Sequence, residues 1–137
     1  MNKFIIDASV ILGYLLQKNE KIVNRVESLL KKFKKGEIEI YAPQLLFTEV
    51  ANGLRFSLKD ENLAASQFEK YAKLKIDYPP FSEIQMKEII KLSYKLGTTV
   101  YDTSYHFLAI MLNGTFLTCD KEYFVKAKQL EKIELVD

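Results

Sequence analysis

Residues 3–17 read KFIIDASVILGYLLQ, and the order of apolar and acidic residues in this stretch sets the expected fold class. Residues 3–6 form a short apolar run that ends at Asp7, which predicts a buried β-strand. Residues 8–17 are apolar nearly all round, which predicts a buried helix directly after the strand. A buried strand followed at once by a buried helix is typical of α/β domains with a parallel sheet.

The same alternation of strand and helix patterns continues along the rest of the chain. Helices are predicted at 20–35, 43–57, 60–74, 82–96, 102–113 and 123–128. Strands are predicted at 38–41, 115–118 and 133–136, with a short extended piece at 76–78. Ser82 and Gln85 form a capping box, and Gly36 and Gly97 follow two helix ends. We therefore expect one three-layer α/β/α domain over residues 1–137, in which helices flank a central, mostly parallel sheet of about five short strands.

Length and composition restrict the class of protein. The 137 residues are 48% hydrophobic and 28% charged, which is the balance of one ordinary globular domain. The single cysteine, Cys119, cannot form an internal disulfide, so a reducing compartment is expected. No apolar run approaches the ~20 residues of a membrane span, and Asp7 interrupts the apolar amino end, which argues against a signal peptide. We expect a cytoplasmic protein that has no membrane partner.

Two acids lie directly after predicted strands. Asp7 follows the strand at 3–6, and Asp120 follows the strand at 115–118. Open parallel sheets bind ligands outside the carboxyl ends of their strands, so both acids are candidates for a functional site. Each acid also opens a helix, and the role of helix N-cap is the alternative for either acid taken alone.

Two further acids, Asp102 and Glu49, lie on predicted helices. Asp102 begins the stripe of its helix that carries Tyr105 and Leu108 toward the core, and an N-cap role is again the alternative. Glu49 lies in the middle of its helix, where capping is excluded, on a face that is otherwise apolar. Buried acids are usually paired or bound to a metal, so an ion pair with a lysine is the alternative for Glu49.

If the four acids converge, their charges require a cation. Two carboxylates about 4 Å apart repel by about 4 kcal/mol at an effective dielectric constant near 20. Oxygen ligands favour Mg²⁺ or Mn²⁺ over zinc, which prefers nitrogen and sulfur ligands. The chain has 20 basic and 18 acidic residues, so setting these four acids aside leaves 14 acidic residues against 20 basic ones. An acidic, metal-holding pocket in a basic remainder is what an enzyme that cleaves phosphodiesters requires.

Four short motifs carry these acids. They are IDASV at 6–10, EVANGL at 49–54, YDTSY at 101–105 and LTCD at 117–120, with Leu108 and Ala109 after the third. Each motif alone is weakly specific, but together, in this order and spacing, they resemble the PIN domain family across essentially the whole chain. Within that family the resemblance is strongest to the VapC-type toxin nucleases of toxin–antitoxin pairs.

The resemblance implies an endoribonuclease that depends on Mg²⁺ or Mn²⁺. One or two ions would be held by an acidic quartet that is both catalytic and metal-binding: Asp7, Glu49, Asp102 and Asp120. Hydrolysis in the family leaves a 5′-phosphate and a 3′-hydroxyl. The family fold, a parallel sheet flanked by helices, agrees with the pattern of elements described above.

The resemblance also implies supporting residues and partners. Thr118 is expected to orient Asp120, and Ser9 is expected to act in the same way beside Asp7. Asn52, one turn after Glu49, is expected at the edge of the pocket. Family members bind RNA as substrate, commonly form homodimers, and are neutralised by a small antitoxin protein whose tail enters the active-site groove.

Several basic residues are candidates for contact with RNA or an antitoxin. One group surrounds Phe33 near the end of a predicted helix and consists of Lys31, Lys32, Lys34 and Lys35. A solvated helix end favoured by the helix dipole is the alternative for that group. Arg55 lies on the Glu49 helix, where it can reach an RNA phosphate or an antitoxin carboxylate. His106 follows Asp102 by four residues and is expected to be an ordinary packing histidine rather than a proton-transfer group.

Other classes of function fit the sequence less well. A metal-independent ribonuclease normally needs an acid and a base near neutral pH, often two histidines, and this chain has one. Haloacid-dehalogenase-type phosphatases need a second aspartate where Ser9 stands, and receiver domains need an acid where Ile6 stands. A catalytically inactive PIN fold that acts as a binding or scaffold protein remains the alternative, although all four acids are present.

Overall fold

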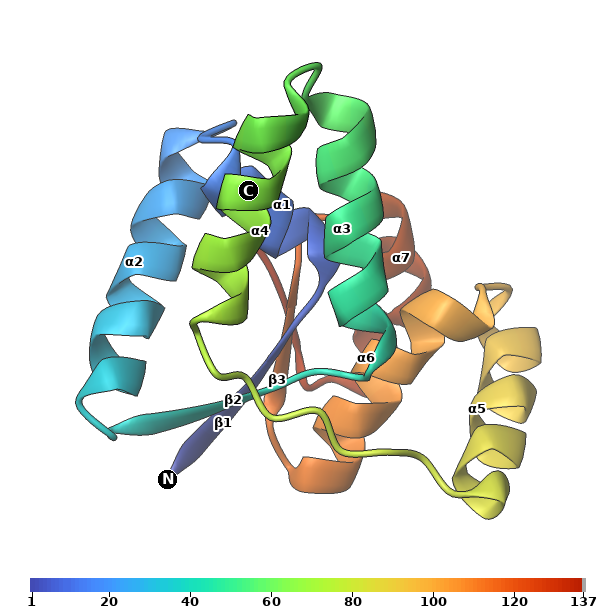
Figure 1. Ribbon diagram of the computed structural model, residues 1–137. Coiled ribbons are helices and arrows are strands. Elements are labelled where there is room, and N and C mark those ends of the chain that lie inside the picture. Colours follow the sequence, from blue (N-terminus) through green and yellow to red (C-terminus); the bar gives the residue numbers. More distant parts are fainter. Residues whose placement is uncertain (137) are drawn as a thin grey trace.

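Four parallel strands form the sheet at the centre of the computed structural model, which describes residues 1–136 (Figure 1). They are β1 (Asn2–Ile6), β2 (Ile38–Tyr41), β3 (Thr115–Thr118) and β4 (Ile133–Leu135), in the order β2-β1-β3-β4. The chain crosses from β1 to β2 on one side and later returns to β3 on the other side. The strand order therefore reverses between β1 and β3, and their carboxyl ends flank the crevice where parallel sheets bind ligands.

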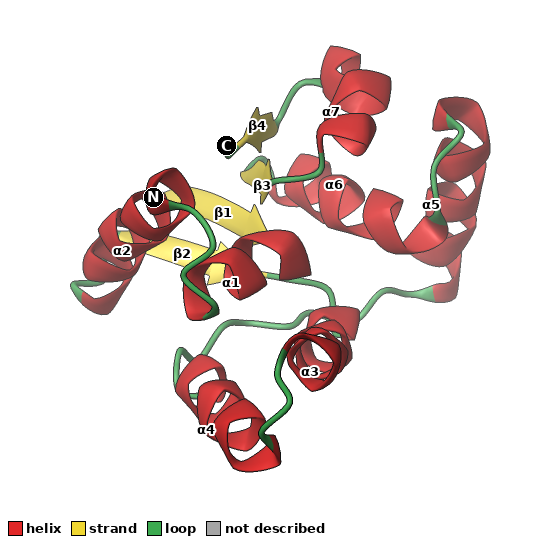
Figure 2. Ribbon diagram, turned by 90° about the horizontal axis from the view of Figure 1, so that it is seen from above, coloured by secondary structure: helices red, strands yellow, loops and turns green. Residues whose placement is uncertain are grey.

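Seven α-helices of the described chain surround this sheet (Figure 2). They are α1 (Ala8–Leu15), α2 (Glu20–Lys34), α3 (Leu45–Ser57), α4 (Glu61–Ala72), α5 (Glu83–Leu96), α6 (Val100–Leu112) and α7 (Lys121–Ala127). Helices α1 and α2 pack on one face, and α6 and α7 pack on the other. The pair α3 and α4 packs outside α1, and α5 packs against α6. None of the helices described here is both long and apolar enough to cross a membrane.

The core fills the space between the sheet and its helices with apolar side chains. Ile5 and Phe116 on the strands, and Val10, Val50 and Leu108 on the helices, are at most 1% exposed. Their regular spacing on each element explains why the sequence predicts these strands and helices. The three-layer architecture predicted from the sequence is therefore confirmed.

Gly53 lets α3 approach α1 closely. A methyl group on Gly53 would lie 2.2 Å from Cδ1 of Leu12 on α1, which is far inside van der Waals contact. A larger residue would push the two helices apart, because the interior around them is closely packed. Gly53 thus sets the distance between α1 and α3. Helix α1 begins directly after Asp7, and α3 carries Glu49 one turn before the glycine.

The structure differs from the sequence prediction at two places. Helix α6 begins at Val100 and is capped by Thr99, two residues before the predicted start at Asp102. The extended piece predicted at 76–78 forms a single parallel bridge, between Asp77 and Tyr41, and so it extends the edge of the sheet beside β2 without becoming a full strand. The other boundaries differ from the prediction by up to two residues, mainly because end turns depend on local capping.

Candidate active site

Asp7 lies at the carboxyl end of β1, and both of its carboxylate oxygens accept hydrogen bonds. Oδ1 accepts from the hydroxyl of Ser9 at 2.5 Å and from the backbone N–H of Val10 at 3.1 Å, so Asp7 is the N-cap of α1. Oδ2 accepts from the hydroxyl of Thr118 at 2.6 Å. All three donors are neutral, so the capping role fixes the carboxylate without cancelling its charge.

Asp120 lies at the carboxyl end of β3 and is linked to Asp7 through the hydroxyl group of Thr118. Its Oδ1 accepts from the backbone N–H of Tyr123 at 3.0 Å, so Asp120 is the N-cap of α7. The Thr118 hydroxyl accepts from the backbone N–H of Asp120 at 3.0 Å, while it donates to the carboxylate of Asp7. The Ser9 hydroxyl accepts from the backbone N–H of Cys119 at 3.0 Å. Thr118 therefore orients the Asp7 carboxylate directly and acts on Asp120 only through its backbone.

Asp102 lies in the first turn of α6, with its carboxylate at a pocket shared with Asp120. The hydroxyl of Thr99 accepts from the backbone N–H of Asp102 at 3.0 Å, so Thr99 is the N-cap and the N-cap alternative for Asp102 is wrong. The pocket has a volume of about 450 Å³ and is also lined by Glu122 and Lys126. Glu122 forms an ion pair with Lys126 at 3.5 Å, so Asp102 and Asp120 are the acids of this pocket without an ion pair among the described residues.

Glu49 lies in the middle of α3 and is half-buried. Its Oε1 accepts from the hydroxyl of Tyr105 on α6 at 2.5 Å. The ion pairs among residues 1–136 use other acids, so the alternative of a salt bridge between Glu49 and a lysine is wrong for the described chain. The donor is a neutral phenol, so it does not neutralise the negative charge of the Glu49 carboxylate.

The electrostatics link the four acids to one another. Burial raises the pKa of Asp7 to about 6, and the negative charge of Asp102 adds to the rise, while its hydrogen-bond donors oppose it. Burial also raises the pKa of Glu49, to which the charge of Asp102 again contributes. Burial and the charges of Asp120 and Glu122 raise the pKa of Asp102. Asp102 is therefore the acid whose charge interacts with each of the other three.

The donor set fits a hard divalent cation in its chemistry. The four side chains supply only carboxylate oxygens, which Mg²⁺ and Mn²⁺ prefer, and none of the four takes part in an ion pair among the described residues. Within residues 1–136, no three His, Cys, Asp or Glu side chains lie close enough together to enclose an ion. Carboxylates repel one another, so without a cation the lower-energy arrangement keeps them apart, each with its own hydrogen-bond donors. A cation would draw them together.

Comparison with known proteins gives the family. A family model described as the PIN domain matches residues 4–130. This chain belongs to the PIN domain family. A comparison with curated protein sequences finds no match.

Solved structures share the fold of this PIN domain at low sequence identity. VapBC2 from Rickettsia felis, bound to a DNA fragment from their promoter, has a TM-score of 0.71 at 15% identity and covers 98% of this chain and 99% of that chain. FitAcB from Neisseria gonorrhoeae has a TM-score of 0.66 at 20% identity, with 98% and 96% of the two chains covered. PAE2754 from Pyrobaculum aerophilum has a TM-score of 0.63 at 19% identity, with 91% and 86% covered.

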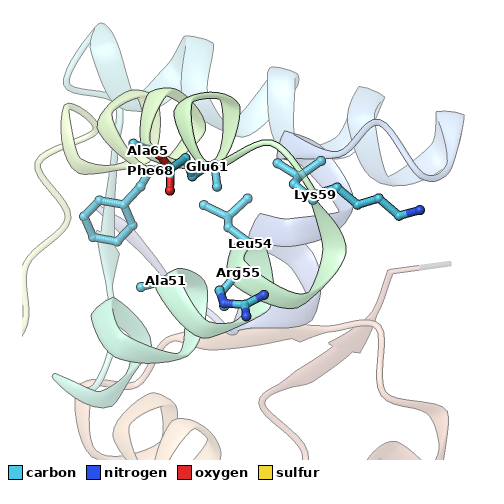
Figure 3. A pocket seen from close by; sticks show the side chains of 9 residues that line it. Ala51, Leu54, Arg55, Lys59, Glu61, Ala65 and Phe68 are labelled. Atoms are coloured by element: carbon cyan, nitrogen blue, oxygen red, sulfur yellow. The ribbon is translucent and has the colours of Figure 1, made fainter.

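Of the four acids, Asp102 and Asp120 line the pocket described above, and Asp7 and Glu49 do not. The remaining candidate residues of this PIN domain do not line it either. Asn52 is exposed on α3, one turn after Glu49. Arg55 and Lys59 line a pocket of about 590 Å³ between α3 and α4, and this pocket contains none of the four acids (Figure 3). The lysine group is exposed at the end of α2, which leads into the amino end of β2, so it lies at the opposite edge of the sheet from the acids: Lys31, Lys32, Lys34 and Lys35. Contact between these residues and RNA or an antitoxin remains a prediction.

His106 is a buried part of the packing, as the sequence indicates. It is 0% exposed, and its Nε2 lies 2.7 Å from the backbone carbonyl of Glu131. A carbonyl only accepts, so Nε2 carries the proton and Nδ1 accepts from the hydroxyl of Tyr123 at 2.9 Å. Burial lowers the pKa of His106, and the ring is neutral. It does not face the acidic pocket with a free nitrogen.

Sequence reasoning missed two residues of the site. Thr99 caps the helix that carries Asp102, and Tyr105 donates to Glu49, although the sequence pattern places Tyr105 only in the core stripe. A buried tyrosine almost always finds a partner for its hydroxyl, and that rule is the signal that would have pointed to a nearby acceptor. The partner itself is 56 residues away in the chain.

Proposed function

We propose that this PIN domain is an endoribonuclease that hydrolyses RNA with the help of Mg²⁺ or Mn²⁺. The observation that carries the proposal is the set of four acids at the carboxyl edge of the sheet, where three have raised pKa values and none is paired with a lysine or arginine among the described residues. Evolutionary relatives in the PIN family are generally nucleases, and the chemistry of this donor set agrees with that activity.

The side chains of the site have distinct roles in this proposal. Asp7, Glu49, Asp102 and Asp120 would hold one or two cations, which supply a Lewis acid and a bound water of lowered pKa. The hydroxyls of Ser9 and Thr118 keep the Asp7 carboxylate in place, and the amino end of α7 keeps Asp120 in place. The acids also attract the cation electrostatically before RNA binds, because their mutual repulsion is relieved by it.

We further propose that the chain is the toxin of a toxin–antitoxin pair that acts in the cytoplasm. The support is the shared fold with proteins named VapBC2, VapBC-1 and FitAcB, and the presence of all four acids. In this proposal a small antitoxin protein and a second copy of the chain are the protein partners, and RNA is the substrate. The alternative is an inactive PIN-fold scaffold, which predicts binding of RNA or protein without cleavage.

Cleavage of end-labelled RNA tests the proposed function. The purified chain should cleave RNA in Mg²⁺ or Mn²⁺, leave a 5′-phosphate and a 3′-hydroxyl, and stop in EDTA. The Asp7→Asn variant should lose at least about 100-fold in rate while it still folds, because asparagine caps a helix as well as aspartate does. The control, Glu27→Gln, changes an exposed acid on α2 and should cleave at the rate of the unmodified chain. Full activity of Asp7→Asn would contradict the assignment of the acids.

A further inference from the structure

Tyr105 on α6 is buried and contacts Glu49, one of the four acids. Only 2% of its surface is exposed. Its ring lies nearly parallel to the ring of Phe116 on β3, with the two planes at 14° and the centroids 5.7 Å apart. This packing leaves the ring little freedom to move, so the position of the hydroxyl group is fixed by the core.

The hydroxyl of Tyr105 is the group that holds the carboxylate of Glu49. It donates to Oε1 at 2.5 Å, across the space between α6 and α3. No other hydrogen-bond donor from residues 1–136 contacts that carboxylate. A glutamate side chain has three rotatable bonds, so without this contact the carboxylate would sample several orientations.

A phenol is suited to hold an acid that must keep its charge. A lysine or arginine in this position would neutralise Glu49 and compete with a cation for it. A phenol hydroxyl donates one hydrogen bond to one oxygen and leaves the other oxygen, Oε2, to accept from or ligate another group. Hydrogen-bond donors behind ligating carboxylates commonly fix the orientation of metal ligands in this way.

We propose that Tyr105 is a positioning residue that holds Glu49 in the orientation in which its carboxylate binds the divalent cation. This inference rests on the proposed function, because it assumes that Glu49 is a metal ligand. Helix α6 then contributes to the site twice: Asp102 supplies one acid, and Tyr105, three residues later, orients another acid that lies on α3.

The test compares Mn²⁺ binding to the unmodified chain with binding to Tyr105→Phe, measured by electron paramagnetic resonance of free Mn²⁺. Tyr105→Phe removes one oxygen atom and should raise the Kd for Mn²⁺ by about 10-fold or more. RNA cleavage should fall by a similar factor at low Mn²⁺ and recover as Mn²⁺ is raised. The matched control is Tyr41→Phe, since Tyr41 donates to Glu39 at 2.6 Å in an equivalent pair on β2, and it should leave the Kd unchanged.

A double-mutant cycle separates positioning from packing. If Tyr105 acts through Glu49, Tyr105→Phe should have no further effect on the Kd in a Glu49→Ala background, which lacks the carboxylate. An equal effect in both backgrounds, or an unchanged Kd in the single variant, would overturn the proposal while leaving the metal site itself intact. Absence of Mn²⁺ binding by the unmodified chain would instead overturn the proposed function, and this inference with it.

A measurement on the unmodified chain covers the case in which Tyr105→Phe does not fold. Without metal, the buried hydroxyl proton of Tyr105 should exchange slowly and give a downfield proton NMR resonance. That resonance should disappear in Glu49→Ala, which removes the acceptor, and persist in Tyr41→Phe. If this resonance is absent from the folded, unmodified chain at every pH from about 6 to about 8, the contact on which the proposal depends is overturned.

Discussion

Asp102 and His106 are ionisable residues one turn apart on α6, but the groups that surround their side chains differ. Each ring nitrogen of His106 has a partner, Tyr123 or the carbonyl of Glu131, and the ring is neutral. The hydroxyl of Thr99 is a neutral hydrogen-bond partner of the Asp102 side chain, and the charges of Asp120 and Glu122, which act on it, are negative. Both ring nitrogens of His106 form hydrogen bonds within the chain, so His106 contributes to folding. The negative charge of Asp102 has no cationic partner among the described ion pairs, which is typical of a residue that binds a ligand.

Glu134 on β4 gives the same contrast among the acids. Both of its oxygens accept from the guanidinium of Arg25 at 2.9 Å, a bidentate ion pair. The four proposed site acids have neutral donors only. Glu134 thus has a positively charged partner, whereas the donors to the four proposed site acids are hydroxyls and backbone N–H groups. We expect the first kind of acid to stabilise the fold and the second kind to bind a cation.

The largest expected effect is on RNA cleavage, and it appears when the amide variant of Asp102 is compared with the amide variant of Glu134. Asp102→Asn should lower RNA cleavage by at least about 100-fold, because the charge that interacts with the other three acids is lost. In chelator its Tm should rise, since repulsion is relieved. Glu134→Gln should cleave normally and lose about 0.5 kcal/mol of unfolding free energy, as expected for a partly exposed ion pair. Cleavage assays and thermal denaturation measure both, and the opposite pattern would invalidate the comparison.

A smaller effect is expected when Thr118 is changed to valine. The substitution keeps the shape of a fully buried side chain but removes the donor to Asp7 and the acceptor for the Asp120 backbone. We expect the Kd for Mn²⁺ to rise by about 10-fold, as is typical when a group that orients a metal ligand is lost. Thr115→Val on the same strand is the control, and calorimetric titration of Mn²⁺ is the measurement. An unchanged Kd for Thr118→Val would show that Asp7 does not depend on this hydroxyl.

The pH dependence of stability should differ in sign between the acids and the histidine. The pKa of Asp7 is about 6 in the folded chain against 3.8 in the unfolded chain, so its contribution to stability is complete below pH 3.8 and lost as the pH rises through 6. In chelator, the unfolding free energy should therefore rise as the pH falls from 7 to about 5, by an amount on the order of 1 kcal/mol. Urea denaturation measures it. Asp7→Asn should reduce this rise, and an equal rise in both proteins would assign it elsewhere.

The smallest effect concerns His106, which should show no response to metal. Its lowered pKa means that the stability from the neutral ring is present above pH 6.5 and lost as the pH falls through the folded-state value. The chain has one histidine, so nitrogen-15 NMR reports on it without assignment. We expect the tautomer with the proton on Nε2, unchanged by Mg²⁺. A Mg²⁺-dependent change of tautomer would place His106 in the site.

Much of the fold, and the position of Asp7 and Asp120 directly after two strands, were predictable because they depend on local patterns. The run ending at Asp7 and the run ending at Asp120 predict strands, and the rule for the carboxyl ends of parallel strands places both acids at one edge. The misplaced start of α6 has a local cause as well, since Thr99 and Asp102 are both good capping residues and only the observed backbone distinguishes them.

The contacts between distant residues were not predictable. The bond from Tyr105 to Glu49 joins two helices, and the bond from Thr118 to Asp7 joins strands that are 111 residues apart in sequence. The partner of His106 is the carbonyl of Glu131. The backbone of Glu131 has a φ of 61°, and the sequence has no glycine at this position that would have indicated such a conformation. Such contacts depend on how the layers are packed, and periodicity along one element carries no information about them.

The central claim is that the four acids form one divalent cation site, and counting the ions that they bind tests it most directly. Mn²⁺ binding should be titrated at neutral pH for the unmodified chain, for Asp102→Asn and for Glu134→Gln. The claim predicts one or two bound ions for the unmodified chain and for Glu134→Gln, and a loss of at least about 10-fold in affinity for Asp102→Asn. Equal binding by all three proteins, or no binding by the folded, unmodified chain, would contradict it.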